Sequence, residues 1–598
     1  MNTKDAKILS NLIDTVHSHL NQEDAIYLVL SLLAWNSLSN NYLLDPEFSL
    51  ENFKDLRDSE DAVKALYSIS RQQEFRSLDH CVKSIRLLQP FVFNILVSQI
   101  LQLQSAGLLN DFDPSDVAQL LAPTKGPGAL DSSLCEFAIR LIGDIHGKQA
   151  YIPWEMSGQF VTRVAKKSAS AFTESQMSLS LAELVSLITD SHATICVSEP
   201  LANPSYISAH GTLKKFDVTL SMPPVGVKVD KEIAQRDMFG RFMHPSTQLA
   251  TLALQHIIAQ TEGKIVFITS NSMLFSAGAE RQLRERIVQN GMLEAVISLP
   301  SGLMSHAGIP LTILVLDTSK KASAVRFVNA AVPYFYQQAT RAKNQLIRTD
   351  ELISLVNSNE DSPYAKSVAI QEIADNDMQL QVNRYVLDAK AQKLNAFMSQ
   401  HEFTALGELV EIIKPIAALA SEDGKPAFEV LAADVPEFGY IHAASKPVQM
   451  DTKSRKAADL KLRQDDIVLM IKGAVGKVGI VGSTNDSYWT VGPSAVILRA
   501  IPGNVDPRAL ALFLRSGLGQ HLLKGAASGA VQPFIQLKEL VTLKIPVSSL
   551  SEHMECGAIL EQEEDIQTQI RRLNASLSEL TPTQWQLPAE SSSDHNNN

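Results

Sequence analysis

The order of hydrophobic and polar positions divides the chain into segments of different character. Apolar residues recur at helical spacing at 7–20 and 91–104, which predicts helices in the first 150 residues. Between 190 and 330, short runs rich in Val and Ile alternate with helical patterns. Alternation of this kind favours an α/β sheet that is largely parallel. From 403 onward, short strands are separated by Gly and Pro turns, and a helical pattern follows at 552–581.

These patterns predict a multidomain protein, and a length of 598 residues also exceeds what one core supports. The predicted parts are an α-helical domain at 1–150, an α/β domain at 151–335, a helical connector at 336–402, a β-rich domain at 403–550, a helix at 551–583 and a disordered tail at 584–598.

Composition narrows the classes of protein. The four cysteines are widely separated and form no CxxC pair, which argues against a zinc site or a disulfide framework and favours a reducing cytoplasm: they are Cys81, Cys135, Cys196 and Cys556. His244 and His306 are isolated, so no metal site is predicted. The apolar run at 25–35 is too short to span a bilayer, and we expect no membrane association.

The net charge of −12 argues against a surface covered by nucleic acid, but it permits a local basic patch. One such patch lies in the β-rich part. Its members are Lys446, Lys453, Arg455, Lys456, Lys461, Arg463, Lys472 and Lys477. A solvated loop face is the plainer interpretation of this cluster when it is taken alone.

A strand predicted at 216–221 ends on two prolines, in the stretch "DVTLSMPPVG" at 217–226. Ligands of parallel α/β sheets bind at the carboxyl ends of strands. The motif therefore lies where chemistry would take place.

By its order of motifs, the region 1–400 resembles the modification subunit of type I restriction–modification systems, an adenine-N6 DNA methyltransferase. Four segments carry the resemblance: "FDVTLSMPPVG", "GRFMHP" at 240–245, the run at 263–317, and "EIADNDMQLQVNRYV" at 372–386. The resemblance implies that the α/β domain is a Rossmann-like methyltransferase domain.

The region 403–581 resembles one half of the specificity subunit of the same systems. The matching segments are "FTALGELVEIIKP", "DIVLMIKGAVGKVGIV" and "GAVQPFIQLKELVTLKIPVSSLSE". The resemblance implies a modification–specificity fusion, with a target-recognition domain at 403–550 and a spacer helix at 551–583. It also places the basic cluster within a predicted reader of double-stranded DNA.

The resemblance implies S-adenosylmethionine as cofactor, held on a glycine-rich Asp-Pro-x-x-Gly turn after the first strand. In the family a Thr-Pro segment precedes that turn, and "YIPWEMSG" at 151–158 is interpreted as this segment, with Ile152 in place of Thr. The following window, 159–210, contains no glycine. Because the backbone itself must approach the ligand, we expect no cofactor to bind.

The base-binding motif also departs from the family pattern. In the family, an Asn side chain and a proline carbonyl accept hydrogen bonds from the adenine amino group, and an aromatic ring stacks on the base. Met222 is a weak acceptor, Val225 has no π-face, and a shifted register with Ser221 as the polar residue still leaves no aromatic ring. We expect no intact catalytic set in the degenerate motif Ser221, Met222, Pro223, Pro224 and Val225.

The joint failure of cofactor turn, base acceptor and stacking residue predicts a pseudo-methyltransferase that acts as a sequence-specific DNA-recognition platform in a restriction or defence system. The alternative is an active S-adenosylmethionine-dependent adenine-N6 DNA methyltransferase with a divergent cofactor site. A nuclease or translocase is the expected kind of protein partner, and the cytoplasm is the expected location.

Two further groups are interpreted as structural. Arg281, Arg284 and Arg286 are predicted to form a solvated helix face, and Trp489 is predicted to be a core aromatic.

The spacer helix carries an apolar heptad seam, which is too short for an isolated coiled coil. Its members are Ile566, Ile570, Leu573, Leu577 and Leu580. Since a full specificity subunit has two recognition domains and this chain has one, we expect a homodimer through this seam. Packing against 386–400 of the same chain is the competing possibility.

Overall fold

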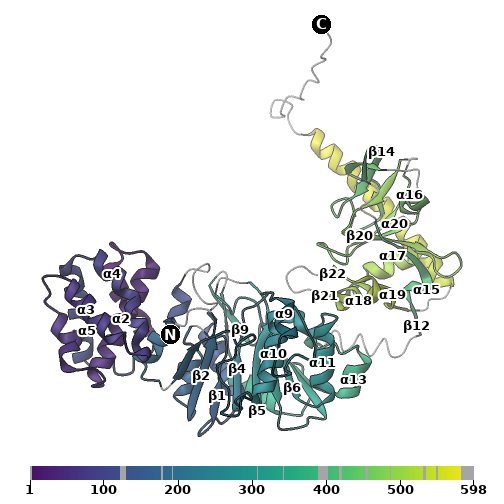
Figure 1. Cartoon of the computed structure of the whole chain (residues 1–598). Coiled ribbons are helices and arrows are strands. Elements are labelled where there is room, and N and C mark those ends of the chain that lie inside the picture. The colour runs from purple at the N-terminus through teal and green to yellow at the C-terminus, as the bar shows by residue number, and fades with distance from the viewer. Residues whose placement is uncertain are drawn as a thin grey trace. The chain divides into compact units, whose positions relative to one another are not determined.

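The computed structural model of the chain separates into two compact units, residues 1–388 and 389–598 (Figure 1). Each unit is described by itself below. The structure describes residues 3–121, 129–155, 157–176, 180–191, 193–305, 308–340, 343–387, 402–415, 420–450, 455–484, 487–528, 534–546 and 550–580.

The first unit begins with the predicted helical domain. Helix α2 is apolar on all sides and forms the centre of the domain. A helix that is surrounded by other helices is expected to have such a sequence. The helices are α1 Thr3–Val16, α2 Gln22–Asn40, α3 Glu60–Ile69, α4 Val82–Leu87 and α5 Pro90–Ser105, with short 3-10 turns at Pro46–Phe48, Leu50–Phe53, Gln73–Cys81 and Val117–Leu120. Helix α8 (Ser180–Ile188) packs against α2 although it lies between two strands of the sheet in sequence.

A nine-stranded sheet follows, in the order β11-β8-β6-β7-β5-β4-β1-β2-β3. The pairs that join β3, β2, β1, β4 and β5 are parallel, and β7 runs antiparallel between β5 and β6. The strands are β1 Gln149–Tyr151, β2 Ser170–Ser175, β3 Ala193–Val197, β4 Phe216–Ser221, β5 Thr261–Ser270, β6 Leu293–Ser298, β7 Leu311–Asp317, β8 Ala324–Asn329 and β11 Ala365–Ala369. The Rossmann-like α/β expectation is thus confirmed.

Helices cover both faces of the sheet, because alternate strand residues point to opposite sides. On β5, Val266 and Ile268 belong to the apolar cluster on the α6 and α12 side, whereas Ile265 and Phe267 belong to the cluster that contains α10 and α11. The helices are α6 Ser132–Ile142, α7 Val161–Ala165, α9 Lys231–Gln235, α10 Leu249–Gln260, α11 Ala279–Gln289, α12 Thr349–Asn357 and α13 Ile370–Asp375, with 3-10 turns at Asn271–Leu274 and Val382–Arg384.

Two predicted boundaries differ from the structure. Helix α6 falls within the predicted helical domain 1–150, but it packs on β4 and β5 of the sheet. The predicted helical connector 336–402 does contain helices α12 and α13, but the hairpin β9 Tyr336–Thr340 and β10 Lys343–Leu346 and the edge strand β11 also lie there, so it is not purely helical. The residues 388–401 lie outside the described part of the chain.

The second unit is β-rich, as predicted. Its main sheet has the order β13-β20-β17-β18-β15, and a smaller sheet has the order β16-β14-β19. Trp489 is buried in the core between them, which confirms its structural interpretation. The strands are β12 Phe403–Ala405, β13 Val410–Ile413, β14 Ala420–Val430, β15 Tyr440–Ile441, β16 Lys446–Met450, β17 Ile467–Met470, β18 Val478–Val481, β19 Trp489–Val491, β20 Ala495–Ala500, β21 Ala527–Ser528, β22 Phe534–Ile535 and β23 Lys544–Pro546.

Helices of this unit lie at Leu406–Leu409 (α15), Arg455–Leu460 (α16), Pro507–Arg515 (α17), Gly517–Ala526 (α18) and Leu537–Val541 (α19). The chain then forms the long helix α20, Leu550–Glu579, where the spacer helix was predicted. Within the described residues, no helix has the length and apolar character that crossing a membrane requires.

Candidate functional site

The two motifs singled out in the sequence lie side by side at the carboxyl edge of the sheet. Strand β1 pairs in parallel with β4, Tyr151 facing Thr219, so the turn after β1 adjoins the prolines after β4. The Ser221 hydroxyl donates a hydrogen bond of 3.0 Å to the Pro153 carbonyl. The chain leaves β1 toward β2 and later returns through β4 on the other side of β1. Such a reversal of strand order is where open α/β sheets bind their ligands.

The turn after β1 corrects the sequence interpretation of the cofactor site. Because β1 is the first strand of the sheet, the expected glycine-rich turn is the segment 152–160 itself, and not a segment within 159–210. Gly158 has φ +86°, and a Cβ on it would lie 2.9 Å from Val185 Cβ. One turn glycine is therefore retained, so the glycine-free window no longer argues against cofactor binding.

Glu155 fills the cradle that this turn forms. Its buried carboxylate accepts hydrogen bonds from the backbone N–H groups of Ser157 (2.8 Å), Gly158 (3.0 Å) and Val161 (3.3 Å). Burial raises the pKa of Glu155 above its ordinary value, and these donors offset only part of that rise. Free N–H groups at such a strand–turn–helix junction are what binds an anionic ligand group. In this protein the Glu155 side chain takes the place of such a ligand group.

The acidic residue at the end of β2 has its hydrogen bonds satisfied within the protein. In Rossmann-type folds an acidic residue near this position receives the ribose hydroxyls of the cofactor. Glu174 is fully buried and accepts hydrogen bonds from the Tyr151 hydroxyl (2.6 Å), the Ser198 hydroxyl (2.6 Å) and the Ser205 N–H (2.7 Å). A ribose would have to displace these donors.

A buried polar chain continues from Glu174 across the strand ends. Tyr151 donates its only hydroxyl proton to Glu174, so its oxygen accepts from His256 Nε2, 2.9 Å away. His256 Nδ1 then accepts from the Arg241 guanidinium at 2.8 Å. This pattern requires a neutral imidazole, and burial followed by the Arg241 charge lowers the pKa of His256 well below its usual value.

Arg241 contacts the segment that follows β3. Its guanidinium donates to the Pro200 carbonyl at 2.9 Å and to the Leu201 carbonyl, and it forms a 2.8 Å ion pair with Asp237. The Trp154 ring contacts the His256 ring edge to face, with ring centroids 5.9 Å apart. The residues present at this edge do not fit S-adenosylmethionine, because its carboxylate and ribose would meet groups that are already paired.

The residues of the predicted base-binding motif pack against the apolar core of the sheet. Met222 and Val225 are partly buried and pack against the apolar cluster that contains Val218 and Leu220, while Pro223 is buried. Neither position supplies an amide acceptor or an aromatic face. The prolines form a rigid exit from β4.

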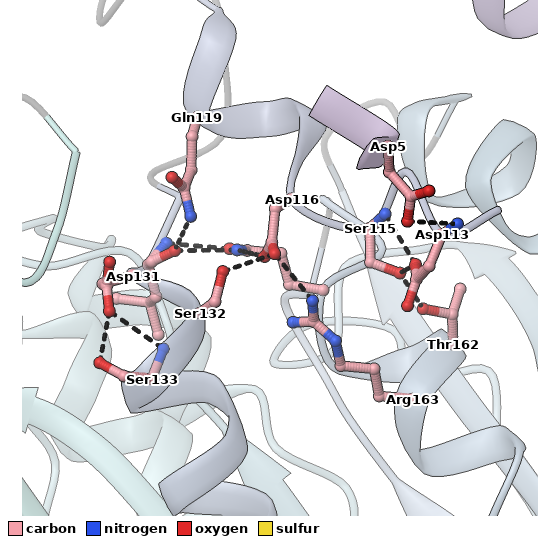
Figure 2. A network of polar contacts seen from close by, with 12 residues as sticks. Asp5, Asp113, Ser115, Asp116, Gln119, Asp131, Ser132, Ser133, Thr162 and Arg163 are labelled. Atoms are coloured by element: carbon pink, nitrogen blue, oxygen red, sulfur yellow. Dashed lines mark hydrogen bonds and ion pairs between the residues drawn. The ribbon is translucent and has the colours of Figure 1, made fainter. Parts of the chain in front are cut away.

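Figure 2 shows a polar network around Asp116, and Gln159 of the turn 152–160 donates a hydrogen bond to that residue. Arg163 of α7 forms a 2.9 Å ion pair with Asp116, which lies near the end of the helical domain. Although burial raises the pKa of Asp116, the Arg163 charge brings it below its ordinary value. Gln159 donates to Asp116 at 2.8 Å, and Ser115 and Thr162 share a 3.0 Å hydrogen bond. These contacts join the turn and the start of α7 to the helical domain.

Within the second unit, the predicted DNA-binding residues differ in their exposure and contacts. Arg463 and Lys472 are exposed, and Lys461 is half-buried. Lys446 forms a 3.1 Å ion pair with Glu429. Arg455 and Lys456 begin α16, with side chains outside the described part, and Lys453 lies outside it entirely.

Lys477 is half-buried, and its ammonium group donates a hydrogen bond of 2.6 Å to the Ala432 carbonyl. Its predicted contact with DNA stays a prediction.

The predicted solvated arginine face is wrong for Arg284. That side chain is 1% exposed, and its guanidinium donates to the carbonyls of Met378, Met273 and Ser276. Arg281 is half-exposed and forms a 2.8 Å ion pair with Asp377. Among the residues that the structure describes, no cluster of His, Cys, Asp or Glu could hold a metal ion; His306 lies outside them.

Only the first half of α20 is anchored to its unit. Glu564 accepts from the Tyr440 N–H (3.1 Å) and His442 (2.9 Å), and these groups with Arg571 outweigh burial and lower the pKa of Glu564 to about 2. The seam residues beyond are exposed, from 41% for Ile570 to 77% for Leu580. Packing of the seam on 386–400 falls outside the described residues.

Sequence reasoning missed the residues that close the carboxyl edge. Glu155 had a local signal, because an acidic side chain just before a helix start commonly caps its N–H groups. Arg241, His256 and Glu174 had none, since their partners come from separate segments.

Comparisons with known proteins agree with the fold. Residues 171–393 match the family described as N-6 DNA methylase, a range that includes Ser221–Val225 and begins after the turn 152–160. The MjaVIII type I restriction enzyme methylase subunit of Methanocaldococcus jannaschii is 28% identical over 214 residues, 32% of this chain and 36% of the relative. The MjaVII methylase subunit of the same organism is 22% identical over 302 residues, 48% of each protein.

The crystal structure of a type I restriction–modification methyltransferase subunit from Streptococcus thermophilus has a TM-score of 0.54 to this chain at 17% identity. The match covers 64% of this chain and 100% of that one, and it shows a shared fold. The chain spans less than half the length of these two curated relatives.

Proposed function

From the match of residues 171–393 to the N-6 DNA methylase family and the similarity to type I methylase subunits, we propose that this protein is a cytoplasmic, sequence-specific DNA-recognition platform that has lost methyl transfer. The observation that carries the proposal is the Glu155 carboxylate on the N–H groups of Ser157, Gly158 and Val161. We expect the cofactor not to bind because the Glu155 side chain occupies its place, and not because a glycine is missing.

Gly158 favours the second candidate function, an active adenine-N6 DNA methyltransferase. Its positive φ preserves the turn that would let backbone approach a cofactor. In that case Glu155 would swing out when S-adenosylmethionine binds. The loss of the base acceptor at Met222 and of the stacking ring at Val225 argues against this candidate.

DNA recognition is assigned to the second unit, which resembles half of a specificity subunit. Exposed cations there include Arg463 and Lys472, and the exposed aromatic residues Phe428 and Phe438 lie in the same unit. Cations supply affinity through phosphate contacts, and apolar rings suit contacts with bases. Binding should therefore depend on residues 403–580.

Replacing Arg463 and Lys472 together by Ala should weaken binding to duplex DNA and reduce the slope of log affinity against log salt by about two, since each phosphate contact contributes about one. Fluorescence anisotropy over a salt series measures both effects. The matched control is Lys83→Ala, an exposed lysine of the helical domain. An unchanged slope in the double variant, or undiminished binding by residues 1–388 alone, would contradict the assignment.

The exposed seam of α20 supports a homodimer that reads a bipartite, near-palindromic site. An apolar stripe of this length requires a partner, and two copies related by a two-fold axis present two recognition domains in inverted orientation. The assembled dimer would then serve a nuclease or translocase partner of a restriction or defence system.

A further inference from the structure

A cavity of about 530 Å³ lies beside the start of α20, in the second unit. Its walls come from α17, from β12 and β23, and from one side of α20. Most of the lining side chains are apolar, among them Leu409, Leu512, Phe513, Ile545, Cys556 and Ile559. A cavity of this size and character is suited to a large apolar side chain.

The α20 residues that line the cavity lie on the same face of the helix as the exposed seam. Cys556 and Ile559 precede Ile566 on the helix at spacings that continue the alternation of three, four and seven residues. Ile559 is itself 48% exposed. A chain that packs along the seam would therefore pass the mouth of the cavity.

The charges of α20 determine how two copies would pair. The acidic residues Glu561 and Asp565 precede the basic residues Arg571 and Arg572 along the helix. Parallel pairing would place like charges together, whereas antiparallel pairing places opposite charges together. With Asp565 level with Arg572 of a second copy, Leu580 of that copy comes level with Gly557, beside the cavity.

We propose that this cavity receives the segment 581–588, "TPTQWQLP", of a second copy, with Trp585 as the anchor. The segment follows Leu580 directly and carries two large apolar residues, Trp585 and Leu587, ahead of a polar end. The proposal rests on the homodimer proposed above and specifies its antiparallel register.

The same chain's own tail cannot reach the cavity while α20 is intact. Ile559 and Leu580 are separated by about 31 Å along the helix at the usual rise per residue. The five residues from Leu580 to Trp585 span at most about 18 Å when fully extended. The occupant must therefore come from another molecule.

Cysteine cross-linking tests the proposal in the full chain. Gln586→Cys places a thiol between Trp585 and Leu587, and a short bismaleimide should join it to Cys556 of the second copy as a covalent dimer. The control Gln586→Cys with Cys556→Ser should give no such dimer. A thiol farther along the tail, Ser592→Cys, should react much less.

Light scattering beside the cross-linking separates this inference from the homodimer itself. A dimer by light scattering without the Cys556-dependent cross-link would overturn the tail docking and leave the seam dimer in place. A monomer would overturn both. An internal cross-link without a gain in mass would show that the chain's own tail is the occupant, against the proposal.

Trp585→Ala gives a second measurement with no cross-linker. Losing a buried Trp anchor should raise the dimer dissociation constant about tenfold or more, while the apolar seam still permits dimers at high concentration. Sedimentation measures the constant, with Gln586→Ala as the matched control. An unchanged constant in Trp585→Ala would contradict the docking.

Discussion

Arg241→Ala should destabilise the first unit by about 3–5 kcal/mol, because it leaves the buried Asp237 carboxylate without its partner. The two side chains are 1% and 3% exposed, and Arg241 also holds the carbonyls of Pro200 and Leu201 together with His256. Urea titration of the full chain, read from the exchange protection of β1 and β4, measures the free energy of unfolding.

Arg236→Ala is the matched control, five residues away in the same loop. Its side chain is 79% exposed and pairs with Glu232, so its loss should cost less than about 1 kcal/mol. A cost below about 1 kcal/mol for Arg241→Ala would mean that the buried chain from Arg241 to Glu174 does not hold the strand ends together.

Ile570→Asp combined with Leu573→Asp should abolish the dimer and the tight site-specific binding of DNA. Each substitution places a carboxylate on the seam, and burying an unpaired carboxylate is costly enough to separate the helices. Weak, salt-sensitive binding through the single recognition domain should remain. Light scattering and anisotropy with a randomised duplex pool measure the two effects.

Ala575→Asp adds a charge on the opposite face of α20 and should leave the dimer intact. Circular dichroism of all the variants checks that α20 itself is retained. A wild-type protein that is monomeric at micromolar concentration, with and without DNA, would contradict the dimer.

Elements with a local pattern were predictable from the sequence. The strand at 216–221 and α20 follow from apolar runs and heptad spacing, because burial of one face repeats with the period of the element. The burial of Trp489 in the core was predicted on similar grounds, because a large aromatic residue in a small β-rich domain is usually buried. The position of the base motif at a strand end followed from the parallel sheet.

The cofactor turn was misplaced because β1 is only three residues long, Gln149–Tyr151. So short a strand leaves no apolar run to recognise, and "YIPWEMSG" was therefore interpreted as a segment that precedes the turn. The buried charges were missed for another reason. Arg284 and Lys477 are satisfied by the carbonyls of Met378 and Ala432, which are distant in sequence and meet them only in the fold.

Titration calorimetry of the full chain with S-adenosylmethionine tests the loss of methyl transfer most directly, with duplex DNA in a parallel titration as proof of an active preparation. The filled cradle at Ser157, Gly158 and Val161 predicts no heat from the cofactor at millimolar concentration, and saturable heat from DNA. Glu155→Gln, which keeps the size of the side chain and removes its charge, should remain without cofactor binding, because the Glu174 and Arg241 contacts persist. A dissociation constant for S-adenosylmethionine in the micromolar range would contradict the account and favour an active methyltransferase.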